Sequence, residues 1–141
     1  MKKFITMSKK IEKQFLDYWN GRFPNLQAVM EYKPQEAFWE TCNTDLKYLD
    51  WIKVSPYRDF RGDFAIVKQD NKLGLLAEFD GAGGSHESLT GIQRDRQKNN
   101  QNLKFGYITV RFPVKTVRAN MAYVADEILE TYEFWMGIIG A

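Results

Sequence analysis

Two apolar runs separated by a turn-forming dipeptide place the strongest constraint on how this chain can fold. GDFAIVK (62–68) and KLGLLAEF (72–79) each have the length and apolar content of a β-strand, and Asp70-Asn71 between them suits a tight turn. We therefore predict an antiparallel hairpin, the most definite structural prediction that the sequence allows.

The register of this hairpin gathers carboxylates at one end of the sheet. If Asp70 and Asn71 are the two loop residues, residues whose numbers sum to 141 lie opposite one another, so Asp63 faces Glu78. Because side chains alternate along a strand, Asp80 shares the face of Glu78. Like charges opposed on a sheet are destabilising and raise one another's proton affinity unless a cation neutralises them.

A divalent metal ion is one solution to this accumulation of charge. Mg²⁺ prefers oxygen ligands, and Asp63, Glu78 and the carbonyl of Phe79 offer three; Mn²⁺ suits the same set. A metal held there can polarise a phosphoryl oxygen and generate hydroxide for attack on a phosphodiester. The alternative is that Asp63 and Asp80 mark strand ends and Glu78 points to solvent, since a turn longer by one residue would remove the pairing.

Elements before the hairpin are predicted with less detail. Ser8 can cap a helix that runs to about Asn20, because apolar residues recur there at helical spacing. Two prolines interrupt the segment 24–50, for which we expect short helices and loops. A further strand is expected to begin in WIKVSPY (51–57).

After the hairpin, a helix and a strand complete a crossover. Thr90 can cap a helix that ends at Gly106, and YITVRF (107–112) reads as a buried strand. A strand, a helix and another strand predict a parallel crossover unit. Beyond Pro113, apolar residues recur at spacings of three and four, which predicts one long amphipathic helix.

These elements predict a mixed α/β fold in which helices flank a small mixed sheet. We expect a single domain with a helical part (1–50), a core (51–112) and a C-terminal helix (113–141). With 44% apolar and 27% charged residues, the chain resembles neither a disordered nor a membrane protein. We expect a cytoplasmic protein, because no run is long enough to span a bilayer and the N-terminus lacks the hydrophobic run of a signal peptide. Cys42 is the only cysteine, which excludes an internal disulfide and makes no recognisable zinc site.

Charge is unevenly distributed along the chain. Residues 1–13 hold five lysines against one acid, and residues 89–118 hold seven Lys or Arg against one acid. Residues 119–141 hold four acids and no base. The pattern favours a face that binds a polyanion, although solvated helix faces would give the same distribution.

The segment from Pro56 to Phe112, about 57 of the 141 residues, carries a resemblance to a known family. Its motifs are PYRDFRGDFAI, LLAEFDGAGGSH, GIQRDRQKNN and GYITVRF. Their order resembles the PD-(D/E)XK nuclease superfamily, and within it the very-short-patch-repair-like branch of small phage, restriction and homing endonucleases. The resemblance implies a restriction-endonuclease-like core.

The resemblance also implies roles for individual residues. Asp63 is similar to the family's metal-bridging aspartate and Glu78 to its second metal ligand. Asp80 stands where many members have a lysine that orients the attacking water and stabilises charge. Lys98 or His86 is expected to supply that missing function.

Three further residues match motifs of the branch. His86 resembles a histidine that acts as general base or acid near the scissile phosphate, and the alternative is an exposed loop histidine. Asp95 matches an aspartate on the helix that follows the loop; the alternative is that Asp95 makes a surface contact with Asn99 or Arg94. Glu12 matches a first-helix glutamate near the metal-bound waters, although its register favours an ordinary solvated position.

The helix 91–105 is polar between Ile92 and Leu103, so it suits contact with phosphates. The basic residues expected to bind DNA are Arg94, Arg96, Lys98, Arg111, Lys115 and Arg118. For any one of them, a solvated cation is the simpler interpretation.

The sequence therefore predicts a Mg²⁺-dependent endonuclease acting on double-stranded DNA, in a restriction, homing, mismatch or junction role. A homodimer would cut both strands, with the apolar end Phe134–Ile139 as interface or as core. The alternatives are a catalytically degenerate DNA-binding module of the same fold and an RNA-directed nuclease.

Overall fold

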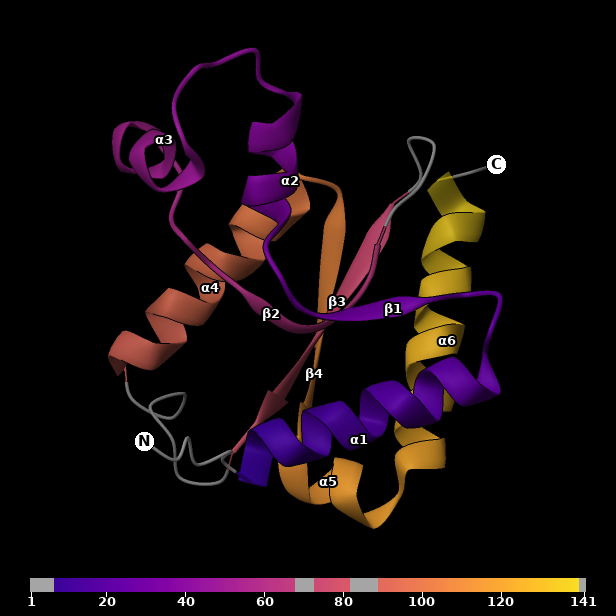
Figure 1. Cartoon of the computed structure of the whole chain (residues 1–141). Coiled ribbons are helices and arrows are strands. Elements are labelled where there is room, and N and C mark those ends of the chain that lie inside the picture. Colours follow the sequence, from indigo (N-terminus) through magenta and orange to yellow (C-terminus); the bar gives the residue numbers. More distant parts are fainter. Residues whose placement is uncertain (1–6, 68–72, 82–88, 140–141) are drawn as a thin grey trace, which may run out of the picture.

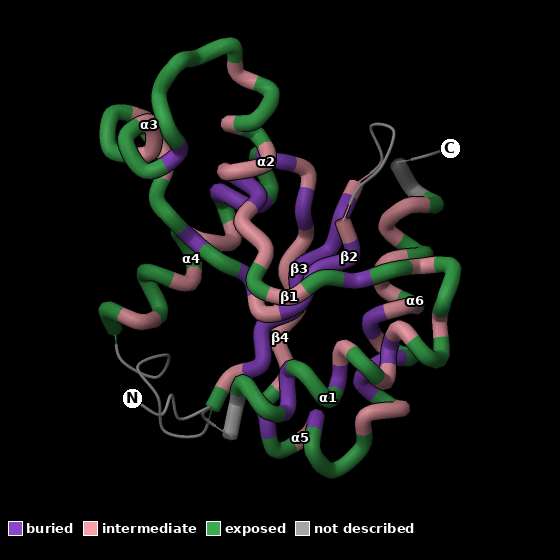
Figure 2. The backbone as a smooth tube through the Cα atoms, in the orientation of Figure 1, coloured by how far each residue is buried: buried purple, intermediate pink, exposed green. Residues whose placement is uncertain are grey.

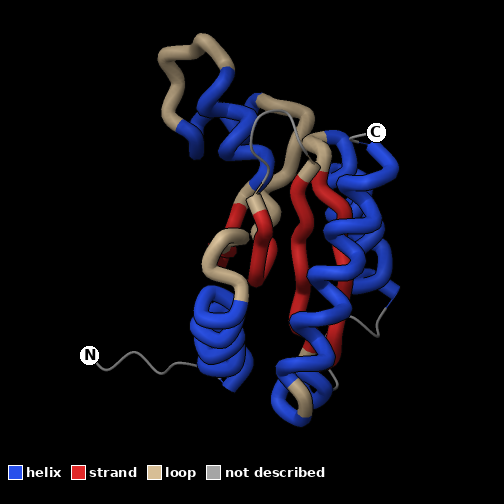
Figure 3. The backbone as a smooth tube through the Cα atoms, turned by 90° about the vertical axis from the view of Figure 1, so that its right-hand side faces the viewer, coloured by secondary structure: helices blue, strands red, loops and turns tan. Residues whose placement is uncertain are grey.

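The computed structural model describes residues 7–67, 73–81 and 89–139, which form four strands and six helices (Figure 1). In chain order these are α1 (Met7–Arg22), β1 (Ala28–Tyr32), α2 (Pro34–Thr41), α3 (Tyr48–Val54), β2 (Gly62–Ile66), β3 (Gly74–Asp80), α4 (Leu89–Lys104), β4 (Tyr107–Pro113), α5 (Val114–Ala119) and α6 (Met121–Ile139). The strands make one sheet in the order β1-β2-β3-β4, side by side in Figure 3. Because β1, β2 and β3 are antiparallel and β3 and β4 are parallel, the prediction of a mixed sheet flanked by helices is confirmed.

The hairpin has the predicted register. Ala65 pairs with Leu76 and Ile66 with Leu75, so each pair of numbers sums to 141. The predicted turn residues, Asp70 and Asn71, lie outside the described residues. The crossover is also confirmed, because β3 and β4 run parallel with α4 between them along the chain. Gly106, at φ 84°, takes the left-handed conformation that commonly ends a helix.

The two faces of the sheet are covered by different helices. Apolar residues of α1, α5 and α6 pack on one face, together with Phe64 and Phe79. On the opposite face, Ala65 and Leu76 form a smaller cluster with residues that follow α4. Figure 2 shows the buried residues concentrated along the central strands. Burial on both faces explains why these strands read as continuous apolar runs.

Helix α4 docks on the sheet through amides rather than an apolar stripe. Asn102, with no exposed surface, donates from Nδ2 to Thr109 Oγ1 of β4 at 3.1 Å. Gln101, also buried, bonds both the N–H and the C=O of Arg58. These contacts account for a helix whose sequence lacks apolar residues over most of its length.

The structure corrects several predictions for individual elements. The segment 24–50 contains a strand, β1, which was not expected among short helices and loops. WIKVSPY does not begin a strand, because α3 ends within it. Ser8 and Thr90 lie inside α1 and α4, so neither occupies the predicted cap position.

The C-terminal helix is also different from the prediction, because it is interrupted. Asn120 separates α5 from α6, and its Oδ1 accepts a hydrogen bond from the Tyr123 N–H at 3.0 Å. This contact is typical of an asparagine at a helix start. In the apolar end, Phe134 is 68% exposed, so this side chain does not belong to the core.

Candidate functional site at the end of the sheet

Acidic residues meet where β2 begins and β3 ends. Asp63 follows Gly62 at the start of β2, and its Oδ2 accepts a hydrogen bond from the Phe79 N–H at 2.9 Å. Since Phe79 packs in the core on the α1 face, Glu78 and Asp80 lie on the alternate face, toward α4. The predicted juxtaposition of Asp63 with the end of β3 is therefore present.

Glu78 is buried, with 5% of its surface exposed, so the alternative in which it points to solvent is wrong. Burial and then the negative charge of Asp63 raise the pKa of Glu78 to about 8, while the Lys98 ammonium opposes the rise. Lys98 reaches Glu78 from α4 and forms an ion pair with its Oε1. Among the described residues, Lys98 is the cation that compensates this carboxylate.

Lys98 is held on both sides. Besides the ion pair, its Nζ donates a hydrogen bond to the carbonyl of Arg61. Its side chain is only 14% exposed, so the interpretation of this residue as a solvated cation is wrong. The Lys98 ammonium, supplied by α4, therefore stands beside the Glu78 carboxylate.

Glu12 of α1 is a third carboxylate at this site. It is 5% exposed, so the expected solvated position is wrong. Burial and then Asp63 raise the pKa of Glu12 to about 7. The sequence spacing could have predicted that Glu12 is buried. Glu12 precedes the buried Phe15 by three residues and the buried Trp19 by seven, which places all three on one helix face.

Asp80 and Asp95 are linked through Arg111 of β4. The Arg111 Nη1 lies 3.7 Å from a carboxylate oxygen of each, and its Nη2 donates to Asn99 Oδ1 at 3.0 Å. Arg111 was expected to bind DNA, but the structure places its guanidinium between two acids. The contact of Asp95 with Arg111 was not among those considered from the sequence.

These side chains open onto a cleft of about 650 Å³, which we call the sheet-end cleft. Its lining includes Glu12, Asp63, Glu78, Asp80, Arg94 and Lys98. Arg94 is exposed and lines this cleft. Arg96, Lys115 and Arg118 are exposed without lining it. His86 and most of the glycine-rich loop lie outside the described residues.

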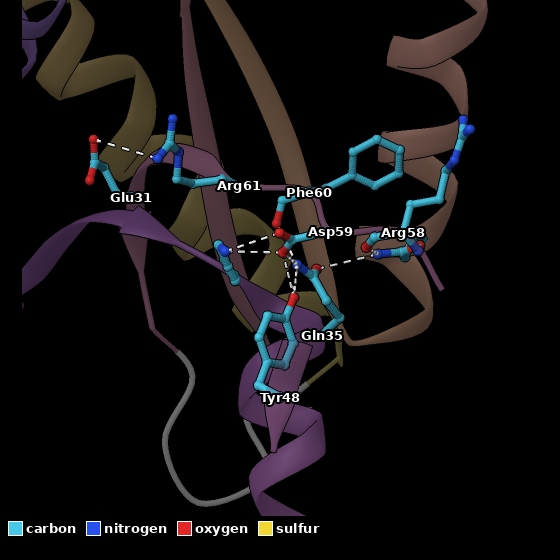
Figure 4. Close-up of polar contacts among 9 residues, drawn as sticks. Glu31, Gln35, Tyr48, Arg58, Asp59, Phe60 and Arg61 are labelled. Carbon is cyan, nitrogen blue, oxygen red and sulfur yellow. Dashed lines mark hydrogen bonds and ion pairs between the residues drawn. The ribbon is translucent and has the colours of Figure 1, made fainter. Parts of the chain in front are cut away.

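The sheet-end cleft is also lined by Asp59, Phe60 and Arg61, which the sequence did not reveal. Figure 4 shows the polar contacts around this segment. Gln35 has no exposed surface and donates from Nε2 to the carbonyl of Phe60 and to Tyr48 Oη. Tyr48 in turn donates to Asp59 Oδ1, which also pairs with Lys33 Nζ at 3.0 Å. We call this set the bracing network: Lys33, Gln35, Tyr48, Asp59 and Gln101.

The oxygen atoms at the end of the sheet are of the type that a hard cation such as Mg²⁺ binds. Asp63 and Glu78 supply carboxylate oxygens, and the carbonyl of Phe79 lies on the β2 side because its N–H does. Within residues 7–67, 73–81 and 89–139, no group of three or more His, Cys, Asp and Glu side chains is arranged to hold a metal ion. A metal here would be held by Asp63, Glu78 and the Phe79 carbonyl, with water and substrate as further ligands.

Comparisons with protein-family models, with curated proteins and with solved structures found no match. Among the helices that the structure describes, none is both long and apolar enough to cross a membrane. The function is accordingly inferred from the chemistry of the sheet-end cleft.

Proposed function

We propose that this protein is a Mg²⁺- or Mn²⁺-dependent endonuclease with a restriction-endonuclease-like core, acting on phosphodiesters of double-stranded DNA. The observation that carries the proposal is the pairing of Asp63 with the buried Glu78 at the end of the hairpin. Burial, and then the negative charge of Asp63, raise the pKa of Glu78 to about 8. A divalent cation would relieve the repulsion between the two carboxylates.

Five residues of the sheet-end cleft have a role in this proposal. Asp63, Glu78 and the carbonyl of Phe79 hold the metal, which supplies Lewis-acid polarisation of the phosphoryl group and an acidified water. Lys98, fixed by Glu78 and the Arg61 carbonyl, stabilises negative charge that develops on the phosphate. Glu12 takes up a proton near neutral pH, in keeping with its pKa of about 7.

A direct test compares Asp63→Asn with wild type on supercoiled plasmid in Mg²⁺. We expect wild type to nick or linearise the plasmid and Asp63→Asn to lose at least about a hundredfold of the rate, as for removal of one catalytic electrostatic group. Asp45→Asn, a matched change at an exposed position, should retain full activity. Equal activity of wild type and Asp63→Asn would overturn the assignment.

A binding readout separates loss of metal from loss of fold. Mg²⁺ should raise the melting temperature of wild type and of Asp45→Asn, because a ligand that binds only the native state stabilises it. The same addition should leave the melting temperature of Asp63→Asn unchanged.

We also propose that the protein acts as a homodimer. Sedimentation with and without duplex DNA measures its oligomeric state.

A second candidate is a DNA-binding module without nuclease activity. It is favoured by one observation, the ion pair in which Lys98 compensates the charge of Glu78. The module would bind duplex DNA in Mg²⁺ and in EDTA alike, and would leave plasmid, single-stranded DNA and RNA intact. Cleavage of RNA alone would instead identify an RNA-directed nuclease.

A further inference from the structure

Beside the sheet-end cleft lies a second hollow of about 470 Å³, which we call the side cleft. Four polar residues line the side cleft but not the sheet-end cleft: Arg58, Thr90, Gln93 and Gln97. Asp59, Phe60 and Arg94 line both clefts. The two hollows therefore adjoin, and a chain molecule bound in one can continue into the other.

The side cleft is rich in hydrogen-bond donors. Its described lining has two guanidinium groups, two primary amides and a hydroxyl. The one carboxylate among these described residues, Asp59, is compensated by Lys33 Nζ at 3.0 Å. Within the described part of the chain, no carboxylate forms an ion pair with Arg58 or Arg94. Such a donor set matches the oxygens of a phosphate group.

Arg58 is held in place before any ligand arrives. Its N–H donates to Gln101 Oε1 at 2.9 Å, and its carbonyl accepts from Gln101 Nε2 at 2.8 Å. Its Nη1 donates to Gln97 Oε1 at 2.7 Å, a neutral partner that leaves the positive charge uncompensated. A fixed backbone and an oriented guanidinium reduce the entropy lost when a phosphate binds.

We propose that the side cleft binds a backbone phosphate adjacent to the scissile one on the same DNA strand, with Arg58 and Arg94 as its ligands. This inference rests on the proposed function, because it assumes that the sheet-end cleft holds the reacting phosphodiester. Arg94, which lines both clefts, faces both phosphates, whereas Arg58 belongs to the side cleft alone. Arg58 is therefore the residue whose substitution tests the side cleft separately.

The test measures DNA affinity against salt in the Asp63→Asn background, in which the duplex stays intact. Arg58→Gln should weaken binding about tenfold, the loss of one charge-assisted phosphate contact. It should also lower the slope of log affinity against log salt by about 0.9, the value for one phosphate. Lys104→Gln, the same charge change at the exposed far end of α4, should alter neither quantity, and Arg58→Lys should keep most of the slope.

A scan with single uncharged methylphosphonates locates the contact. We expect wild type to lose affinity at one position beside the cleavage site, and Arg58→Gln to lose that sensitivity at the same position. If Arg58→Gln matches Lys104→Gln while wild type still cleaves DNA, the side cleft is not a phosphate site and the proposed function stands. If wild type neither binds nor cleaves DNA, both proposals fail.

Discussion

The bracing network and the sheet-end cleft both contain buried polar side chains, and they differ in how well their charges are matched. In the bracing network, Gln35 has hydrogen-bond partners for its amide nitrogen and its carbonyl oxygen. Although burial opposes it, the Tyr48 hydroxyl and the Lys33 ammonium hold the pKa of Asp59 below its usual range. Every charge in this network has a complementary neighbour.

The sheet-end cleft is organised in the opposite way. The negative charge of Asp63 disfavours the charged forms of both Glu12 and Glu78, and among the described residues Lys98 is the cation that contacts Glu78. Burying carboxylates with incomplete compensation costs folding free energy. A matched network braces the fold, whereas a mismatched one is stabilised by what it binds, and the following changes test that distinction.

The largest expected effect is the loss of activity in Lys98→Met. The substitution keeps the aliphatic chain but leaves Glu78 without its ammonium partner and removes positive charge from the cleft. We expect the initial rate of plasmid nicking to fall by about two to four orders of magnitude, the range for a group that assists proton transfer or charge. Lys104→Met on the same helix should cleave normally, and wild-type rates for Lys98→Met would refute the role.

A large loss of stability is expected for Gln35→Leu. The change leaves the Phe60 carbonyl and Tyr48 hydroxyl without their amide partner, each costing about 1–3 kcal/mol when buried and unpaired. The free energy of unfolding in urea should therefore fall by about 2–4 kcal/mol, without dependence on Mg²⁺. Gln27→Leu, at an exposed position, should change it by less than about 0.5 kcal/mol. A stable Gln35→Leu protein would mean that the network does not brace the fold.

A smaller effect is the pH dependence of stability in the absence of metal. Because the pKa values of Glu12 and Glu78 in the folded state lie above the ordinary glutamate value of 4.5, the folded state binds more protons than the unfolded chain. This stabilisation is complete below about pH 4.5 and is lost as pH rises through about 7 and then 8.

The charged groups around the two acids act together in this titration. Asp63, Glu31, Lys9 and Arg61 surround Glu12, and Asp63 and Lys98 flank Glu78. Glu12→Gln should make the decline in unfolding free energy shallower between pH 5 and 8, as measured by urea titration at each pH. A decline as steep as in wild type would show that Glu12 does not carry the excess proton.

The smallest effect is expected for Arg96→Gln. This residue is exposed and lines neither cleft, so its charge contributes only general attraction to DNA. Affinity should fall less than in Arg94→Gln, and the unfolding free energy should stay within about 0.5 kcal/mol of wild type. A larger loss for Arg96→Gln than for Arg94→Gln would move the DNA surface away from the clefts.

What could be predicted from the sequence depended on local rules. The pairing of Ala65 with Leu76 follows from strand alternation and the turn, both contained within one short segment. The bracing network could not be predicted, because Gln35, Tyr48 and Gln101 are brought together only by the packing of three helices. The solvated position expected for Glu12 is wrong because Glu12 precedes the buried Phe15 by three residues, a spacing that places both side chains on one helix face.

The mode of attachment of α4 also limits how this helix can be displaced. An apolar stripe tolerates sliding and rotation, because dispersion contacts have little directional preference. Gln101 and Asn102 instead join α4 to the Arg58 segment and to Thr109 through directional hydrogen bonds. Both the rotation of the helix and its position along its axis are thereby fixed. Lys98, one turn before Gln101, therefore meets Glu78 at a defined point, which makes the polar sequence of α4 an alignment device for the cleft.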